Sequence, residues 1–116
     1  RVRVLTDYPN SLDFNAFDFT IMAAGYNSYH EAIRFSVPTI SIPNMNTGMD
    51  DQLARVEVAE AAGAMIVLRE VTPRRVQAAI ERLMQESVRK SMISSCETLH
   101  RPNGANQMSK WIINEI

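Results

Sequence analysis

The chain is poor in the residues that form disulfides and zinc sites. It has one cysteine, Cys96, and two histidines, His30 and His100, among its 116 residues. A single thiol cannot form an internal disulfide bond, and His30 has no second Cys or His at ligand spacing. No motif links a histidine to a nucleophile, so no Ser-His-Asp arrangement is predicted. A reducing, cytoplasmic compartment is the simplest expectation for such a chain.

Net charge and long apolar runs are also lacking. The formal net charge is −1 and the pI is about 6.1, so the chain has no overall electrostatic attraction to nucleic acid. The basic residues are dispersed, and none of the apolar runs approaches the roughly 20 residues that a membrane-spanning helix needs. We therefore expect no nucleic-acid partner for this chain.

Strand-like and helical patterns alternate along the chain. The strand-like runs are Val2–Thr6, Phe19–Ala23, Thr39–Ile42 and Ala64–Leu68. The helical patterns are Asn27–Phe35, Asp51–Ala62 and Pro73–Glu86, with one or two more between Val88 and Glu115. This alternation predicts an α/β fold, a Rossmann-like parallel sheet flanked by helices. Thr72-Pro73 is typical of a helix start, and Gly63 is typical of a helix end.

A glycine turn stands where the strand predicted at Phe19–Ala23 becomes a helix. Gly25 permits a sharp turn, and the first backbone N–H groups of the helix then point beyond the strand end. Asn27 and Ser28 can add side-chain donors there, and the helix dipole favours negative charge at that point. Glu31 follows about one helical turn later on the same face. As an alternative, Ser28 and Glu31 fit a capping box that only starts the helix.

A second polar cluster follows the strand predicted at Thr39–Ile42. In a doubly wound sheet its loop would face the same crevice as the glycine turn. Asp51 and Gln52 offer carboxylate and amide groups suited to a hydroxyl-rich ligand. As an alternative, Asp50 and Asp51 cap the next helix and complement its dipole. Together with Glu31 these carboxylates are too few for a hard cation, so no metal is expected.

Several short motifs resemble those of a known family. The chain is similar to the donor-binding C-terminal domain of GT-B glycosyltransferases, and to glycosyltransferase family 28 in particular. That family includes the lipid-II-forming N-acetylglucosaminyltransferase, and the UDP-glucosyltransferases of plants show the same motif order. In this chain the motifs are Gly25-Tyr26-Asn27-Ser28-x-x-Glu31, Val37-Pro38-Thr39, Ile42-Pro43 and Asp51-Gln52.

The resemblance implies roles for the first cluster. Gly25, Asn27 and Ser28 would hold the diphosphate of a nucleotide sugar through backbone and side-chain donors, and Glu31 would bind the ribose hydroxyls. The plant enzymes place a phosphate-contacting histidine where this chain has Ala23. Backbone amides would therefore carry more of the interaction with the diphosphate.

The resemblance also implies roles for the second cluster and for an earlier loop. Asp51 and Gln52 would bind hydroxyls of the donor sugar, with Asp50 as a neighbouring candidate. In the family, the loop after the preceding strand contacts the nucleobase, which points here to Tyr8. No cofactor and no metal are implied, because backbone dipoles at the helix start take the place of a cation.

At the level of the whole protein, the resemblance implies that residues 1–116 are the donor-binding domain, a fragment of a larger two-domain protein. The reaction would move a hexosyl or N-acetylhexosaminyl group from a UDP-type donor to an acceptor hydroxyl. The acceptor site and the general base would belong to an N-terminal domain or a partner subunit, which could also associate peripherally with a membrane. The alternatives are a non-catalytic donor-binding subunit of a split glycosyltransferase and a nucleotide-sugar epimerase of the same architecture.

Overall fold

The computed structural model describes residues 2, 4, 11–46 and 51–100. A short 3-10 helix precedes three strands and four α-helices in the order expected of an α/β fold. The elements are η1 (Ser11–Ala16), β1 (Thr20–Ala23), α1 (Tyr26–Arg34), β2 (Thr39–Ile42), α2 (Gln52–Ala61), β3 (Met65–Val67), α3 (Pro73–Leu83) and α4 (Glu86–Leu99). The prediction of a Rossmann-like sheet flanked by helices is confirmed. Most of the strand predicted at Val2–Thr6 and everything after His100 lie outside the described residues.

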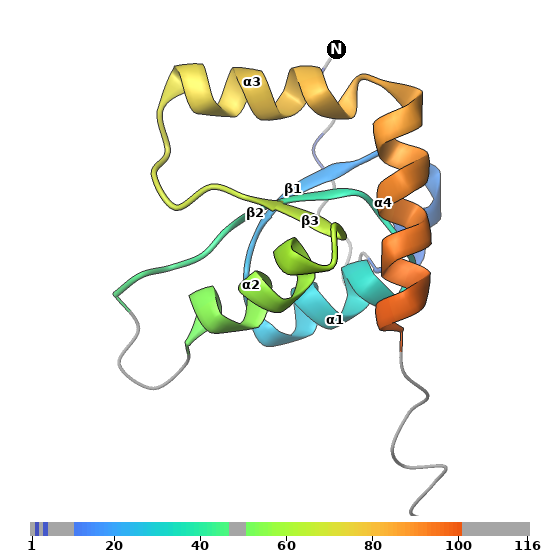
Figure 1. Ribbon diagram of the computed structural model, residues 1–116, viewed down its shortest axis with the longest axis horizontal. Helices are drawn as coiled ribbons and strands as arrows, with labels where there is room; N and C mark the ends of the chain where they lie inside the picture. Colours follow the sequence, from blue (N-terminus) through green and yellow to red (C-terminus); the bar gives the residue numbers. More distant parts are fainter. Residues whose placement is uncertain (1, 3, 5–10, 47–50, 101–116) are drawn as a thin grey trace, which may run out of the picture.

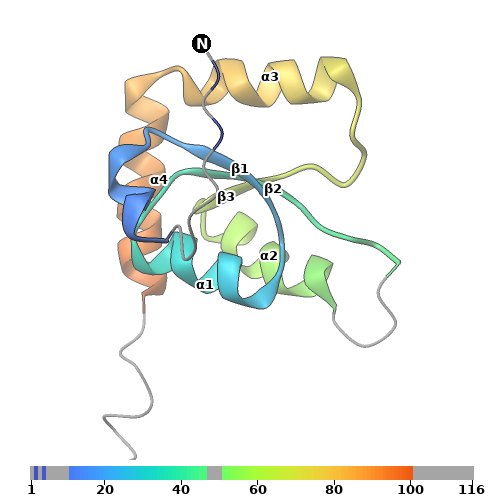
Figure 2. The same cartoon turned by 180° about the vertical axis from the view of Figure 1, so that it is seen from behind.

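The three strands form one parallel sheet in the order β1-β2-β3. Thr20 pairs with Thr39 and Ala23 with Ile42, so β1 and β2 end at the same edge of the sheet. Because the strand order follows the chain, α1 and α2 pack on the same face, while α3 lies on the opposite face (Figures 1 and 2). Helix α4 runs from α3 to α1 and contacts both.

Strand β2 is the centre of the sheet. Thr39 and Ile40 are fully buried, and Ser41 is almost fully buried. The hydroxyl of Thr39 donates a hydrogen bond to the carbonyl of Val37 at 2.8 Å, which satisfies a polar group in the core. In contrast, Ile21 on β1 is 43% exposed, because β1 is an edge strand of the described sheet. The side chains on one face of β1 are therefore exposed, and those on the other face are half-buried.

Apolar side chains form one layer on each face of the sheet. The layer under α1 and α2 contains Ala24, Ala32, Ile33, Val56, Ala59, Ala64, Met65, Val67 and Cys96. The layer under α3 contains Ile40, Leu68, Ala79, Leu83 and Met92. Helix α4 contributes to both layers, through Cys96 to the first and through Met92 to the second. These contacts fix α1 and α2 against the sheet and thereby position their N-terminal ends.

Two helices end in the same backbone motif with different residues. After α1, Ser36 has φ 53°, and Val37 N–H donates to Ala32 at 3.0 Å. After α2, Gly63 has φ 79°, and Ala64 N–H donates to Ala59 at 2.8 Å. Both are Schellman motifs with a left-handed residue just past the helix. The helix end predicted at Gly63 is confirmed, whereas a serine takes this place after α1.

Helix α3 is shorter than the sequence pattern indicates. It begins as predicted, with the Thr72 hydroxyl accepting from Arg75 N–H at 3.2 Å. It ends at Leu83 rather than at Glu86, and α4 starts almost immediately. The guanidinium of Arg89 donates to the carbonyls of Leu83 and Met84 at 2.8 and 3.0 Å. A side chain from the next helix thus caps this end, in place of the glycine or proline that sequence rules look for.

Candidate functional site

The N-terminal ends of α1 and α2 lie at one edge of the sheet. Strand β1 ends at Ala23, and α1 begins at Tyr26. Strand β2 ends at Ile42, in register with Ala23, and α2 begins at Gln52 after a loop. Both helices therefore start beyond the carboxyl ends of parallel strands, which is where open α/β sheets bind their ligands.

Gly25 is the N-cap residue of α1, and no side chain caps this helix. Asn27 and Ser28 are its second and third residues, so the capping box expected from Ser28 and Glu31 is not formed. The backbone angles of Gly25 are φ −59° and ψ 152°, which any residue can adopt. A glycine is therefore not required for this turn, contrary to the sequence-based interpretation. A Cβ added at Gly25 would meet nothing within 4 Å, so the glycine leaves open space at the helix start.

The backbone amides at the start of α1 have no acceptor within the helix. The first intrahelical hydrogen bond runs from Tyr29 N–H to the Gly25 carbonyl at 2.9 Å. The amides of Tyr26, Asn27 and Ser28 precede it and are the donors that an α-helix leaves unpaired at its N-terminus. The first turn of α1 contains no acidic residue to complement the helix dipole. Charge and hydrogen-bonding geometry both favour an anion here.

Glu31 stands on α1 one turn after Asn27 and Ser28, which places these residues on one face of the helix. Its side chain is half-buried, and no hydrogen bond joins it to another residue in the described part of the chain. Tyr26 is 62% exposed. Its ring lies 4.4 Å from that of His30, centroid to centroid. The exposed start of α1 therefore carries amide, hydroxyl, carboxylate and aromatic groups together.

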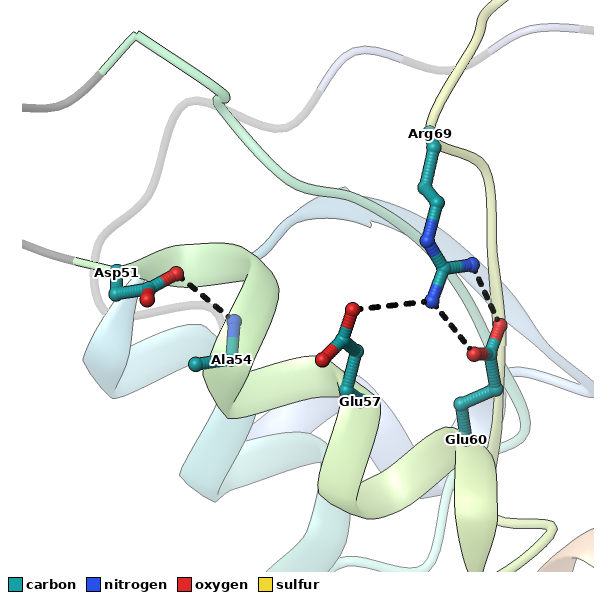
Figure 3. A network of polar contacts seen from close by, with 5 residues as sticks. All are labelled: Asp51, Ala54, Glu57, Glu60 and Arg69. Atoms are coloured by element: carbon teal, nitrogen blue, oxygen red, sulfur yellow. Dashed lines mark hydrogen bonds and ion pairs between the residues drawn. The ribbon is translucent and has the colours of Figure 1, made fainter.

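Asp51 and Gln52 are both held by hydrogen bonds at the start of α2. The carboxylate of Asp51 accepts from Ala54 N–H at 2.9 Å and caps the helix (Figure 3). The side-chain oxygen of Gln52 accepts from Asn44 N–H at 2.9 Å, which ties the beginning of the loop after β2 to α2. The capping alternative for Asp51 is thus correct. These two hydrogen bonds leave the second carboxylate oxygen of Asp51 and the amide nitrogen of Gln52 for other partners.

Two predicted contacts lie outside the described residues. They are Asp50, a candidate for the donor sugar, and Tyr8, a candidate for the nucleobase. In the described ranges, no three His, Cys, Asp or Glu side chains gather in a way that could hold a metal ion. Within the same ranges, no helix combines the length and apolar character needed to cross a membrane.

Sequence reasoning missed Arg55, which joins the two helix starts. It lies on α2, one turn after Asp51, and its Nη1 donates to the carbonyl of Ala24 at 2.7 Å. Its guanidinium also lies over the ring of Tyr26, 5.3 Å from the centroid. Burial raises the pKa of Tyr29, while the Arg55 charge acts in the opposite direction. The only sequence signal was its spacing from Asp51, and an arginine on a helix is usually a solvated surface residue.

A second arginine at the same edge has a structural role. Arg69, just after β3, makes two hydrogen bonds to the carboxylate of Glu60, at 2.8 and 3.0 Å (Figure 3). A longer contact of 3.4 Å reaches Glu57. The hydrogen bonds from Arg69 hold the pKa of Glu60 below its usual value. This network attaches the chain after β3 to α2 and so keeps α2 in place.

The fold is that of an α/β domain with an open parallel sheet, and helix N-termini at the carboxyl edge of such a sheet are where proteins of this class commonly bind phosphate-bearing ligands. The family model for the glycosyltransferase family 28 C-terminal domain matches residues 6–108, and the chain belongs to this family. The match includes both helix starts described above. It assigns the domain to glycosyltransferases and to the binding of a nucleotide-sugar donor. None of the curated proteins matches the chain.

Proposed function

We propose that this chain binds a UDP-type nucleotide sugar and supplies the donor site for transfer of a hexosyl or N-acetylhexosaminyl group to an acceptor hydroxyl. The observation that carries the proposal is the start of α1. Gly25 leaves open space there, and the next three amides have no acceptor within the helix. A diphosphate matches both features, because its oxygens accept hydrogen bonds and its charge opposes the helix dipole.

In the proposed arrangement, each helix start binds one part of the donor. The amides at Asn27 and Ser28, with their side chains, hold the diphosphate, and Gly25 lets it approach the backbone. Glu31 accepts hydrogen bonds from the ribose hydroxyls. On α2, Asp51 and Gln52 bind hydroxyls of the sugar, with Asp50 as their neighbour and Tyr8 beside the nucleobase.

Transfer breaks the bond between the anomeric carbon of the sugar and the diphosphate oxygen. The electron pair stays on that oxygen, and the acceptor oxygen forms the new bond to the anomeric carbon. The acceptor proton passes to a base that we place on another domain or a partner subunit. The start of α1 acts on the leaving group, because its fixed amides stabilise charge that increases as the bond breaks. We propose that no bound metal is needed, so EDTA should leave the transfer rate unchanged.

Nucleotide titration of the complete gene product tests this proposal. Calorimetry with UDP, and with ADP, GDP and dTDP as alternatives, measures affinity for the nucleoside diphosphate. Asn27→Ala should weaken UDP binding by about tenfold, the scale of one hydrogen bond to a charged group. Glu81→Ala, which removes an exposed carboxylate on α3, is the matched control and should bind like the wild type.

The ribose contact has its own test. If Glu31 binds the ribose hydroxyls, wild type should prefer UDP over 2′,3′-dideoxy-UDP, and Glu31→Ala should lose this preference. If both proteins show the same preference for UDP over 2′,3′-dideoxy-UDP, Glu31 does not bind the ribose hydroxyls. If the wild type binds none of the nucleoside diphosphates, the proposed function is wrong.

A further inference from the structure

Arg55 connects the starts of α1 and α2, which lie far apart in the sequence. It belongs to the first turns of α2, and its guanidinium reaches the residues on either side of Gly25. On one side it donates to the Ala24 carbonyl at 2.7 Å. On the other it lies over the ring of Tyr26, the first residue of α1. One side chain therefore spans from the start of α2 to the start of α1.

The bond to Ala24 is partly shielded from solvent. Ala24 is 1% exposed, and the bond itself is partly buried. A guanidinium donor makes a stronger hydrogen bond than a neutral group, and a carbonyl that loses its partner in such a place is left unsatisfied. This contact should therefore persist while the fold is intact.

The Ala24 carbonyl and the Gly25 N–H belong to the same peptide unit. That unit is planar and trans, so a donor that fixes the carbonyl direction also fixes the N–H direction. Gly25 has no side chain to hold its backbone, and no side chain caps α1. Among the described contacts, Arg55 thus supplies the side-chain restraint on the peptide that leads into α1.

We infer that Arg55 is a positioning residue that sets the first turn of α1 relative to α2. This inference rests on the proposed function, in which α1 holds the diphosphate and α2 holds the sugar. Arg55 keeps the two ends of the donor site at a fixed separation. It acts on the phosphates and not on the nucleoside.

The test compares ligands with and without phosphate in the complete gene product. UDP and uridine are titrated into wild type, Arg55→Met, Arg55→Lys and Arg69→Met. Arg69→Met is the matched control, because it removes a guanidinium that contacts α2 through Glu57 and Glu60 but not Ala24. Arg55→Met should weaken UDP binding by about tenfold and leave uridine binding within about twofold. Arg55→Lys keeps the charge and an N–H donor for the Ala24 carbonyl and should recover most of the UDP affinity.

The UDP and uridine affinities of these variants show whether Arg55 has a positioning role. If Arg55→Met binds UDP as wild type does, or weakens UDP and uridine equally, Arg55 has no positioning role for the phosphates. If Arg55→Met does not fold, Arg55→Lys decides, because an Arg55→Lys protein that folds normally and does not bind UDP also overturns the inference. An equal loss of UDP affinity in Arg69→Met would assign the effect to general loosening of α2. A wild type that binds no nucleoside diphosphate overturns the proposed function and this inference together.

Discussion

Replacing Gly25 by alanine should weaken ligand binding while leaving the stability of the fold nearly unchanged. The backbone at Gly25, with φ −59° and ψ 152°, lies in a region that alanine adopts without strain. The new Cβ would meet nothing within 4 Å. Gly25→Ala therefore adds a methyl group only to the space in which we place the diphosphate.

Two small effects on stability oppose each other in this variant. Alanine reduces the conformational entropy of the unfolded chain, which stabilises the fold by about 0.4 to 1 kcal/mol. Alanine is also a poorer N-cap residue than glycine, by about 0.5 to 1 kcal/mol. The free energy of unfolding should therefore change by less than about 0.5 kcal/mol. For a domain of this size, that corresponds to a shift in Tm of only about 2 to 4 °C.

The effect on donor binding should be much larger. A phosphate oxygen that accepts a hydrogen bond from the amides at the start of α1 lies about 2.9 Å from a backbone nitrogen. The alanine methyl group beside these amides would prevent so close an approach. Losing one charge-assisted hydrogen bond costs about 1.5 to 3 kcal/mol, or at least about tenfold in Kd. Calorimetric titration of UDP and a thermal melt on the same sample measure both quantities. Unchanged UDP affinity in a folded Gly25→Ala protein would refute the placement of the diphosphate.

Three further predictions concern stability and reactivity. Ser36→Gly should stabilise the protein by about 0.5 to 1 kcal/mol in denaturant melts, because φ 53° is unfavourable for serine. Gly63→Ala should destabilise the protein by about 1 to 2 kcal/mol, because Gly63 has a positive φ. A change of the same sign in both variants would contradict the Schellman assignment. Burial raises the pKa of Cys96 to about 11, so its thiol should resist a disulfide reagent at pH 8 until the protein unfolds, and rapid labelling of the native protein would show that the thiol is accessible. The pKa of Glu60 is lowered by Arg69, so its contribution to stability is present above the ordinary value of 4.5 and is lost as the pH falls through the folded value. Melts of Arg69→Met across that range should show a weaker pH dependence, and an unchanged profile would count against the ion pair.

Most of the fold follows from local patterns in the sequence. Short β-branched runs and amphipathic stretches located β2, β3 and the helices to within a few residues, because their periodicity reflects which side chains are buried. The break after Leu83 escaped this reasoning, since Arg89 provides the cap from the following helix. The exposure of Ile21 also escaped it, because the place of a strand within a sheet is a tertiary property.

The sequence indicated where the candidate site would lie but not the local geometry of its residues. The polar runs after two strands led to the starts of α1 and α2, because parallel strands place such loops at one edge. The local roles differed from expectation. Ser28 does not cap α1, and the turn at Gly25 needs no glycine, so the reason for a glycine there lies in the space beside the helix.

The element order, the polar groups at two strand ends and the family follow from the amino-acid sequence, because they depend on residue type and spacing along the chain. The reach of Arg55 from α2 to the Ala24 carbonyl and the open space beside Gly25 are visible in the three-dimensional structure alone. Both facts depend on how α1 and α2 pack on one face of the sheet. Contacts between residues 31 positions apart leave no periodic pattern in the sequence from which they could be inferred.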